Sequence, residues 1–287
     1  MIVAYDGSGF HGFAAQPGLQ TVAGSLCDAI GKVTGHRVEL VCAGRTDSGV
    51  HAWGQVVHVD LDPAVEPDAL AKSVNSMVGP RIVVRQISVA PDGFDARHSA
   101  LARRYGYLIL NSPVASPFLA ATSWHVGDAL DMHALMLAAD PLIGEHDFSS
   151  FCRRAPDKKP GDPMVRKVLG VKWSEVDPWP PMQGSGSHGA GTTSGASAAG
   201  AAGAGGVAGA AGACDVAGGI RLLRFEIIST SFCHQMVRSL VGTMVEMGRG
   251  RRTAGEMAAI IRSKDRAFAA PPAPPHGLCL EEVIYPN

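Results

Sequence analysis

The sequence predicts an α+β fold made of two related halves of the split β-α-β type. Three observations lead to this prediction. Hydrophobic residues make up 46% of the 287-residue chain, which is enough for a large packed core. Short segments rich in β-branched residues alternate with longer amphipathic segments. The order strand, helix, strand, strand, helix, strand is expected twice, once in each half.

Residues 1–98 are expected to form the N-terminal half. Runs rich in β-branched residues mark its strands, and Thr21 stands where the N-cap of the first helix belongs. In chain order, the expected elements are a strand at Ile2 to Tyr5, a helix at Thr21 to Val33, strands at Val38 to Cys42 and Gln55 to Leu61, a helix at Pro67 to Met77 and a strand at Arg81 to Ile87.

Residues 99–287 are expected to form the C-terminal half. Asp131, Ser231 and Thr253 stand at N-cap positions ahead of its helices. In chain order, the expected elements are a strand at Tyr105 to Leu110, a helix at Asp131 to Leu142, strands at Val168 to Trp173 and Leu222 to Ile228, helices at Ser231 to Met247 and Ala254 to Arg262, and a strand at Leu280 to Tyr285.

A low-complexity segment, residues 184–219, separates two of these strands. Its 36 residues hold 13 of the 35 glycines and no Lys or Arg. Such a segment buries too little apolar surface to offset the entropy of ordering it, so we expect a disordered Gly/Ala-rich insertion. Because closure entropy grows only logarithmically with loop length, an insertion at a hairpin tip is predicted, and its deletion should leave activity largely intact.

The charges nearly balance, with 25 Lys and Arg against 26 Asp and Glu, so the net charge neither requires nor excludes a polyanionic partner. Arginine outnumbers lysine 18 to 7, and guanidinium groups bind phosphate well. The basic clusters are either phosphate contacts or solvated surface runs. They are Arg103 with Arg104, Arg153 and Arg154 with Lys158 and Lys159, and Arg249 with Arg251 and Arg252.

The compartment is expected to be the cytoplasm. No apolar stretch approaches the roughly 20 residues of a membrane helix, and the start of the chain lacks the pattern of a signal peptide. The six cysteines have no spacing typical of a zinc site or of a disulfide framework. Reduced thiols are therefore expected.

Two short motifs invite functional interpretations. Residues 7–12 match G-x-G-x-x-G after a strand, but Gln16-Pro17-Gly18 follows where a dinucleotide-binding fold needs a helix N-terminus. A glycine-rich turn is the better interpretation. Asp47-Ser48-Gly49 could be half of an aspartic-peptidase dyad, a chemistry that needs two carboxylates sharing one proton. A symmetric homodimer could supply the second carboxylate, so the peptidase remains an alternative.

A longer block contains the same aspartate. Gly44-Arg45-Thr46-Asp47-Ser48-Gly49-Val50-His51-Ala52 resembles the signature of the tRNA pseudouridine synthase I (TruA) family. The resemblance covers nearly the whole chain outside residues 184–219, because further blocks follow in the family's order. These blocks are Tyr5-Asp6-Gly7-Ser8, Phe94-Asp95-Ala96-Arg97, Arg103-Arg104-Tyr105-Gly106-Tyr107, His146-Asp147-Phe148-Ser149-Ser150-Phe151, Phe232-Cys233-His234-Gln235-Met236-Val237-Arg238 and Gly277-Leu278-Cys279-Leu280.

The resemblance implies an isomerase that converts uridine to pseudouridine at positions 38, 39 and 40 of the tRNA anticodon arm. The base is detached from its sugar, turned and rejoined through carbon, and a carboxylate can hold the covalent adduct. Asp47 matches the family's catalytic aspartate. Taken alone, an Asp-Ser-Gly sequence would equally suit an aspartate that hydrogen-bonds its own turn.

Further site residues are implied in the same way. Arg238 occupies the position of the basic residue paired with the aspartate, and Arg45 that of the arginine that takes the place of the flipped base. Tyr105 matches the aromatic residue that packs on the target base. Flipping a uridine out of its stack costs a few kcal/mol, which such contacts offset. On spacing alone, Arg238 would be a surface residue of an amphipathic helix and Tyr105 a core aromatic.

Four more residues are expected to bind substrate. Leu278 and Leu280 resemble the apolar lining of the uracil pocket, although ordinary core packing explains them equally well. Arg103 and Arg104 belong to the family's central block and are expected to contact the RNA. Phe13-Ala14-Ala15 departs from the family pattern, and this departure leaves RNA docking less determined than the reaction.

The resemblance also implies ferredoxin-like halves whose antiparallel sheets join around a central basic cleft, with Asp47 at the floor of this cleft. It further implies a homodimer in which one tRNA contacts both subunits. No metal and no other cofactor are expected. The arginine clusters then become phosphate contacts, so tRNA affinity should fall steeply with salt. The alternative from another class is a tRNA-binding module that keeps the scaffold without turnover.

Overall fold

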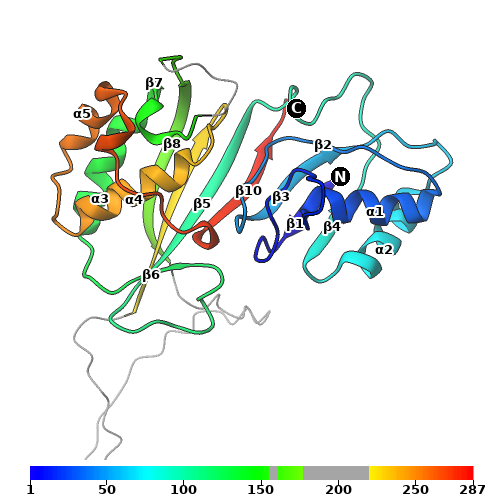
Figure 1. The fold of residues 1–287 in the computed structure, drawn as a ribbon, viewed down its shortest axis with the longest axis horizontal. Helices are drawn as coiled ribbons and strands as arrows, with labels where there is room; N and C mark the ends of the chain where they lie inside the picture. The colour runs from blue at the N-terminus through cyan, green and yellow to red at the C-terminus, as the bar shows by residue number, and fades with distance from the viewer. Residues whose placement is uncertain (155–160, 177–219, 287) are drawn as a thin grey trace, which may run out of the picture.

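The computed structural model describes residues 1–154, 161–176 and 220–286. Their strands form one ten-stranded mixed sheet with the order β4-β1-β3-β10-β5-β9-β8-β7, while β2 pairs with β3 and β6 with β5. Figure 1 shows α1 and α2 beside the N-terminal strands and α3, α4 and α5 beside the C-terminal strands. The architecture is therefore α+β, as the sequence predicts.

The N-terminal half contributes four strands and two helices. Thr21 caps the first helix, because its side chain accepts a hydrogen bond from the backbone N–H of Gly24. The elements are β1 (Ile2–Tyr5), α1 (Val22–Thr34), β2 (Val41–Cys42), β3 (His51–His58), α2 (Pro67–Val78) and β4 (Ile82–Gln86).

The C-terminal half contributes six strands and three α-helices. Asp131 caps α3 as expected, accepting hydrogen bonds from the backbone N–H groups of His133 and Ala134. The elements are β5 (Ala102–Asn111), β6 (Trp124–Val126), α3 (Met132–Ala139), β7 (Gly144–Asp147), β8 (Val165–Val176), β9 (Arg221–Ser229), α4 (Met236–Gly248), α5 (Glu256–Ser263) and β10 (Leu278–Ile284).

The last strand joins the two halves. β10 runs parallel to β3, with Leu280 opposite Ala52, and antiparallel to β5, with Leu280 opposite Tyr105. The hydrophobic core is one continuous cluster that includes residues of both halves. Because the C-terminal strand sits at the centre of the sheet, residues from the beginning, middle and end of the chain meet there (Figure 1).

The structure corrects three expectations. The helix expected from Ser231 begins instead at Met236, because Gln235 has a left-handed backbone with φ of 64° and residues 231–235 form a non-helical segment. Strands β6 and β7 were not predicted, since three or four residues carry too little periodicity. Cys152 and Cys233 form a disulfide, so the prediction of reduced thiols is wrong for this pair.

Residues 177–219 lie between β8 and β9, which pair antiparallel. The predicted insertion at 184–219 falls within this range, outside the described residues. Among the described helices, none has the length and hydrophobicity needed to cross a membrane.

Candidate functional site

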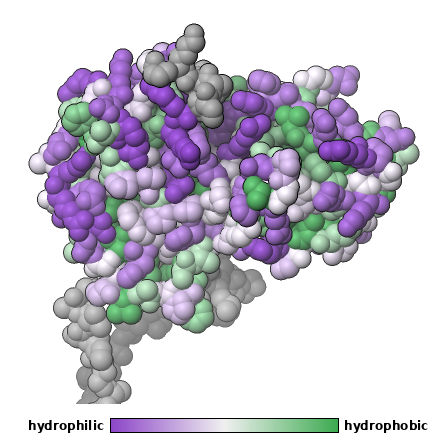
Figure 2. Space-filling model, viewed as in Figure 1, coloured by the Kyte–Doolittle hydropathy of each residue, from purple (hydrophilic) through white to green (hydrophobic). Residues whose placement is uncertain are grey.

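A cleft of about 1890 Å³ lies between the two halves. Its N-terminal wall is built from the loop after β1, α1, the segment around β2 and the turn that contains Asp47, and its C-terminal wall includes β5, β8 and the segment leading into α4. Hydrophilic residues cover much of the face shown in Figure 2. Cationic residues outnumber acidic ones in the lining of the cleft. The acidic residues are Asp28, Glu39 and Asp47, and the cationic ones are Lys32, Arg37, Arg45, Arg97, Arg103, Arg166 and Arg238.

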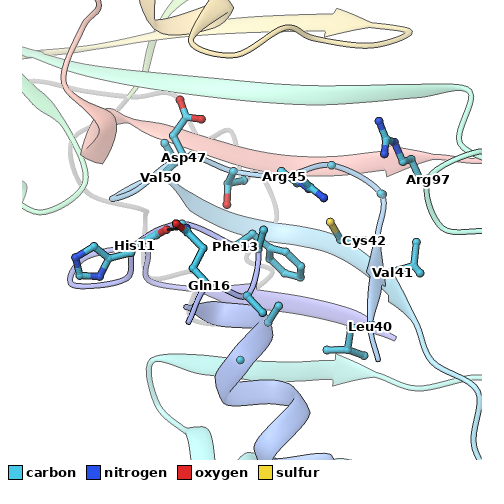
Figure 3. A pocket seen from close by; sticks show the side chains of 18 of the residues that line it. His11, Phe13, Gln16, Leu40, Val41, Cys42, Arg45, Asp47, Val50 and Arg97 are labelled. Carbon is cyan, nitrogen blue, oxygen red and sulfur yellow. Dashed lines mark hydrogen bonds between the residues drawn. The ribbon is translucent and has the colours of Figure 1, made fainter. Parts of the chain in front are cut away.

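Asp47 begins a tight turn after β2. The backbone N–H of Val50 donates to the Asp47 carbonyl at 3.1 Å, and Gly49 has a φ of 77° that favours glycine. A Cβ atom at Gly49 would also lie 3.0 Å from Cγ of Pro275. The Asp47 side chain is 26% exposed and faces the cleft (Figure 3). The turn thus presents one carboxylate on a fixed backbone.

A buried polar network holds the segment just before Asp47. The hydroxyl groups of Tyr5 and Thr46 are 2.8 Å apart, and Nε2 of Gln55 donates to the carbonyl oxygen of Gly44 at 2.6 Å. The backbone N–H of Phe13 donates to the Thr46 carbonyl at 3.1 Å. Because these partners lie on β1, β3 and the opening loop, three separate segments fix the position of residues 44–46.

Two nitrogen-bearing side chains approach the Asp47 carboxylate. The Arg238 guanidinium is 3.7 Å from Oδ2, and Nε2 of His234 is 3.4 Å from Oδ1. Nε of Arg238 also donates to the Ala273 carbonyl at 2.7 Å, which fixes the guanidinium from behind. The predicted pairing of Asp47 with Arg238 is therefore present in the structure. His234 belongs to the block from Phe232 to Arg238 that resembles the family, but no feature of the sequence distinguished it from its neighbours as a site residue.

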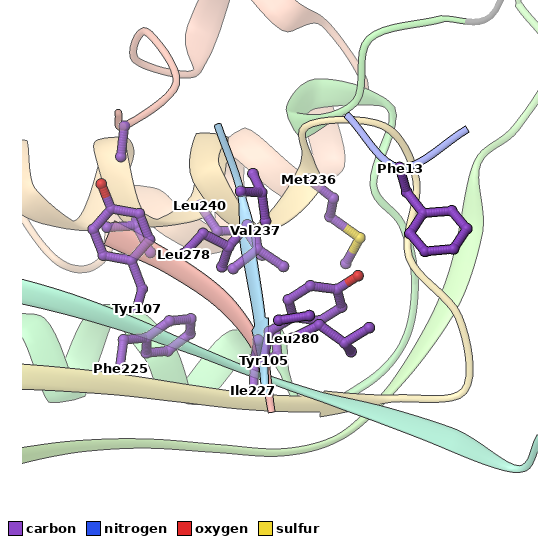
Figure 4. Close-up of a cluster of buried hydrophobic side chains, with 14 of the residues drawn as sticks. Phe13, Tyr105, Tyr107, Phe225, Ile227, Met236, Val237, Leu240, Leu278 and Leu280 are labelled. Carbon is purple, nitrogen blue, oxygen red and sulfur yellow. The ribbon is translucent and has the colours of Figure 1, made fainter. Parts of the chain in front are cut away.

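Tyr105 is buried beneath the first turn of α4. Its ring packs edge-on against Phe232, with 4.9 Å between ring centroids, and it lies among Met236, Val237 and Leu280 (Figure 4). Burial, together with the nearby Tyr5 and Asp47, raises the pKa of the Tyr105 hydroxyl. The phenol therefore stays protonated at neutral pH. Both core packing and contact with a ligand in the cleft are compatible with this position.

Arg45 lies two residues before Asp47 and is exposed on the cleft wall (Figure 3). Leu278 also lines the cleft and is almost completely buried. Leu280 is fully buried in the core below it. The predicted residues Asp47, Arg45, Arg238, Tyr105 and Leu278 thus all line one cavity.

Arg103 and Arg104 point to opposite faces of β5, as successive strand residues must. The buried Arg103 guanidinium lines the cleft, but it donates to the carbonyl oxygens of Ala43, Arg97, Ala100 and Thr230. Arg104 lies on the other face of the sheet and forms ion pairs with Glu226 and Glu282. The structure therefore does not bring Arg104 to the cleft.

The other basic clusters differ from the cations of the cleft. Arg249 and Arg251 form ion pairs with Asp128 and Glu246, and Arg252 donates to the Phe268 carbonyl. Lys158 and Lys159 lie outside the described residues. The cleft instead gathers Lys32, Arg37, Arg45, Arg97 and Arg166, which are scattered along the sequence. Adjacency in the sequence was a poor guide to this surface, because the fold brings the cations together.

Arg166 is the most unusual of these cations. Its Nε is buried without a hydrogen-bond partner, and its Nη1 donates to the carbonyl of the adjacent Val165. Burial lowers the pKa of Arg166, and no described carboxylate pairs with it. A guanidinium in this environment is suited to bind an anion that enters the cleft. Within residues 1–154, 161–176 and 220–286, no cluster of three or more His, Cys, Asp or Glu side chains could hold a metal ion.

Comparisons with known proteins place the chain among related sequences. Residues 138–286 match the family model described as tRNA pseudouridine synthase. Three relatives carry the name tRNA pseudouridine synthase A. The relative from Methylobacterium sp. (strain 4-46) is 38% identical, and the match covers 100% of this chain and 97% of the relative. The relative from Frankia casuarinae is 37% identical, with 99% of this chain and 88% of the relative covered. The relative from Shouchella clausii is 34% identical, with 99% of this chain and 91% of the relative covered.

Proposed function

The chain belongs to the tRNA pseudouridine synthase A family, isomerases that act on uridine in tRNA, and we propose that it modifies positions 38, 39 and 40 of the anticodon arm with Asp47 as the nucleophile. One observation carries the assignment of Asp47. Its carboxylate faces a cleft rich in cations, within 4 Å of both Arg238 and His234. Anionic RNA is attracted to such a cleft, and a fixed carboxylate inside it can reach a flipped nucleoside.

The reaction itself needs no other reactant. The C1′–N1 bond breaks, the uracil turns, and a C1′–C5 bond forms. The proton on C5 is released to water, and N1 takes up a proton, so that no atom is gained or lost overall. In the proposed mechanism Asp47 holds the nucleoside as a covalent adduct while the base turns.

Each neighbouring residue has a proposed role that follows from its position. Arg238 attracts and orients the carboxylate, because its guanidinium is held in place by the Ala273 carbonyl. Arg45, exposed on the same wall, occupies the space that the flipped base leaves. Tyr105 and Leu278 form the apolar floor on which the uracil packs, and burial keeps the Tyr105 hydroxyl protonated.

Strand topology supports the proposal of two related halves. We infer two ferredoxin-like halves, residues 1–98 and 99–287, because each contains the same strand order: β4-β1-β3-β2 in the first and β10-β5-β9-β8 in the second. A homodimer that binds one tRNA across both subunits and a cytoplasmic location complete the proposal. Sedimentation analysis of the purified chain, free and with tRNA, tests the dimer.

Tritium release tests the proposed reaction. With tRNA labelled at C5 of uridine, the wild type should release label to water, and Asp47→Asn should reduce the rate by roughly 10³-fold or more, because amide oxygen is a poor nucleophile. Asp28→Asn is the matched control, since Asp28 lines the same cleft. Label release by Asp47→Asn at the wild-type rate would exclude Asp47 as the nucleophile, and no release by the wild type would favour a binding module.

A further inference from the structure

His234 contacts the Asp47 carboxylate from the segment that leads into α4. Its Nε2 is 3.4 Å from Oδ1, whereas the guanidinium of Arg238, one helical turn further on, is 3.7 Å from Oδ2. The two carboxylate oxygens are thus approached by two different side chains. Both distances exceed a normal hydrogen bond, as is common in an unliganded site whose contacts tighten when substrate binds.

The two partners of the carboxylate differ in exposure. The Arg238 side chain is 13% exposed and is held by the Ala273 carbonyl, whereas the His234 side chain is 43% exposed. A nucleoside entering from the cleft can therefore displace the imidazole but not the guanidinium. Oδ2 stays anchored, and Oδ1 is the oxygen that becomes free.

The backbone around His234 is fixed on several sides. The backbone N–H of Arg153 donates to the His234 carbonyl at 2.9 Å, and the neighbouring Cys233 is bonded to Cys152. On the other side, Gln235 adopts a left-handed conformation that ends the segment and begins α4. His234 is therefore held in place by the fold, although its side chain is partly exposed.

We propose that His234 is a positioning residue for Asp47, which orients Oδ1 toward the cleft in the free enzyme and releases it when the target uridine enters. This inference rests on the proposed role of Asp47 as the nucleophile. Without the imidazole, the carboxylate can rotate about its Cβ–Cγ bond while still paired with Arg238. Loss of orientation lowers the rate of the bound complex more than it weakens substrate binding.

Steady-state kinetics with the C5-labelled tRNA test the proposal. His234→Ala should lower kcat about tenfold with KM changed less than about twofold, and His234→Gln, which keeps an N–H donor, should recover most of the loss. His133→Ala is the control and should leave both constants unchanged, since His133 is an exposed histidine on α3 that does not line the cleft. An unchanged kcat in His234→Ala, or a raised KM alone, would overturn the proposal, and the second result would indicate an RNA contact.

A measurement without turnover separates this inference from the proposed function. In proton NMR spectra, the Hε1 resonance of His234 should shift in Asp47→Asn, while that of His133, which lies outside the cleft, should stay unchanged. This comparison uses only variants in which His234 is intact, so it holds even if His234→Ala fails to fold. An unshifted His234 resonance would reject the contact. Absence of label release by the wild type would instead reject the proposed reaction and leave the contact standing.

Discussion

Arg166 offers a test of the cleft at the level of a single residue. Its half-buried charge has no carboxylate partner among the described residues, so the folded protein carries an uncompensated desolvation cost there. If a tRNA phosphate compensates this charge, Arg166→Ala should weaken tRNA binding about tenfold without lowering the melting temperature. Filter-binding and thermal-melting measurements on the same preparation check both parts.

Lys167→Ala is the control for that substitution. Lys167 is the next residue of β8, is exposed, and does not line the cleft. Its removal should leave tRNA affinity within about twofold, because it contributes only to the overall charge. An Arg166→Ala variant that binds tRNA normally but melts at a lower temperature would show that Arg166 has a structural role and does not bind the anion.

Individual residues were predictable where a motif fixed both identity and backbone. Asp47, Arg45 and Arg238 line one cleft, because the turn after β2 and the start of α4 face each other. His234 and Arg166 were missed, since their roles depend on what the fold places beside them. For Arg104 the prediction was wrong in the opposite sense. The sequence block that contains it resembles the family, so RNA contact was expected, but the alternation of side chains along β5 places Arg104 on the face of the sheet away from the cleft.

At the level of elements, a disulfide connects the segment before α4 to the turn after β7. Cys152 and Cys233 are 81 residues apart in sequence, and their Cα atoms are 5.7 Å apart. A cross-link that closes so long a loop restricts the unfolded chain, so its reduction should lower the free energy of unfolding by about 2–4 kcal/mol. Thermal melting with and without dithiothreitol measures this loss, and Cys233→Ser should abolish the effect of the reductant.

Cys27→Ser serves as the comparison, because Cys27 is a free cysteine. This variant should keep the full response to dithiothreitol. Titration of thiols in the denatured chain provides a second measurement, in which the unreduced protein should show two fewer thiols than the reduced one. Equal thiol counts, together with a melting temperature that the reductant does not change, would contradict the pairing.

The elements themselves were predicted best where periodicity was long. The eight expected strands and five helices all occur, with ends shifted by a few residues. The start of α4 was misplaced because Ser231 is a good N-cap by composition, whereas the left-handed Gln235 decides where the helix begins. Local propensity could not reveal that residues 231–235 are needed as a wall of the cleft.

For the whole molecule, the distribution of charge matters more than its sum. The net charge is −1, yet the lining of the cleft contains seven Lys and Arg residues against three acidic ones. Arg249 and Arg251 already form ion pairs with Asp128 and Glu246, so they attract a phosphate less strongly. An anionic substrate is therefore attracted to one region of a nearly neutral protein, and its affinity should depend on salt.

The cleft cations predict how steep this dependence is. The logarithm of tRNA affinity should fall linearly with the logarithm of salt concentration, and removal of one phosphate-binding cation should reduce the slope by about one. Arg37→Ala is expected to do so, because Arg37 is exposed in the cleft. Arg251→Ala should leave the slope unchanged, because Arg251 is paired with Asp128 and Glu246. Equal changes in the two variants would mean that tRNA responds to total charge, and a flat dependence in the wild type would exclude phosphate binding by the cleft.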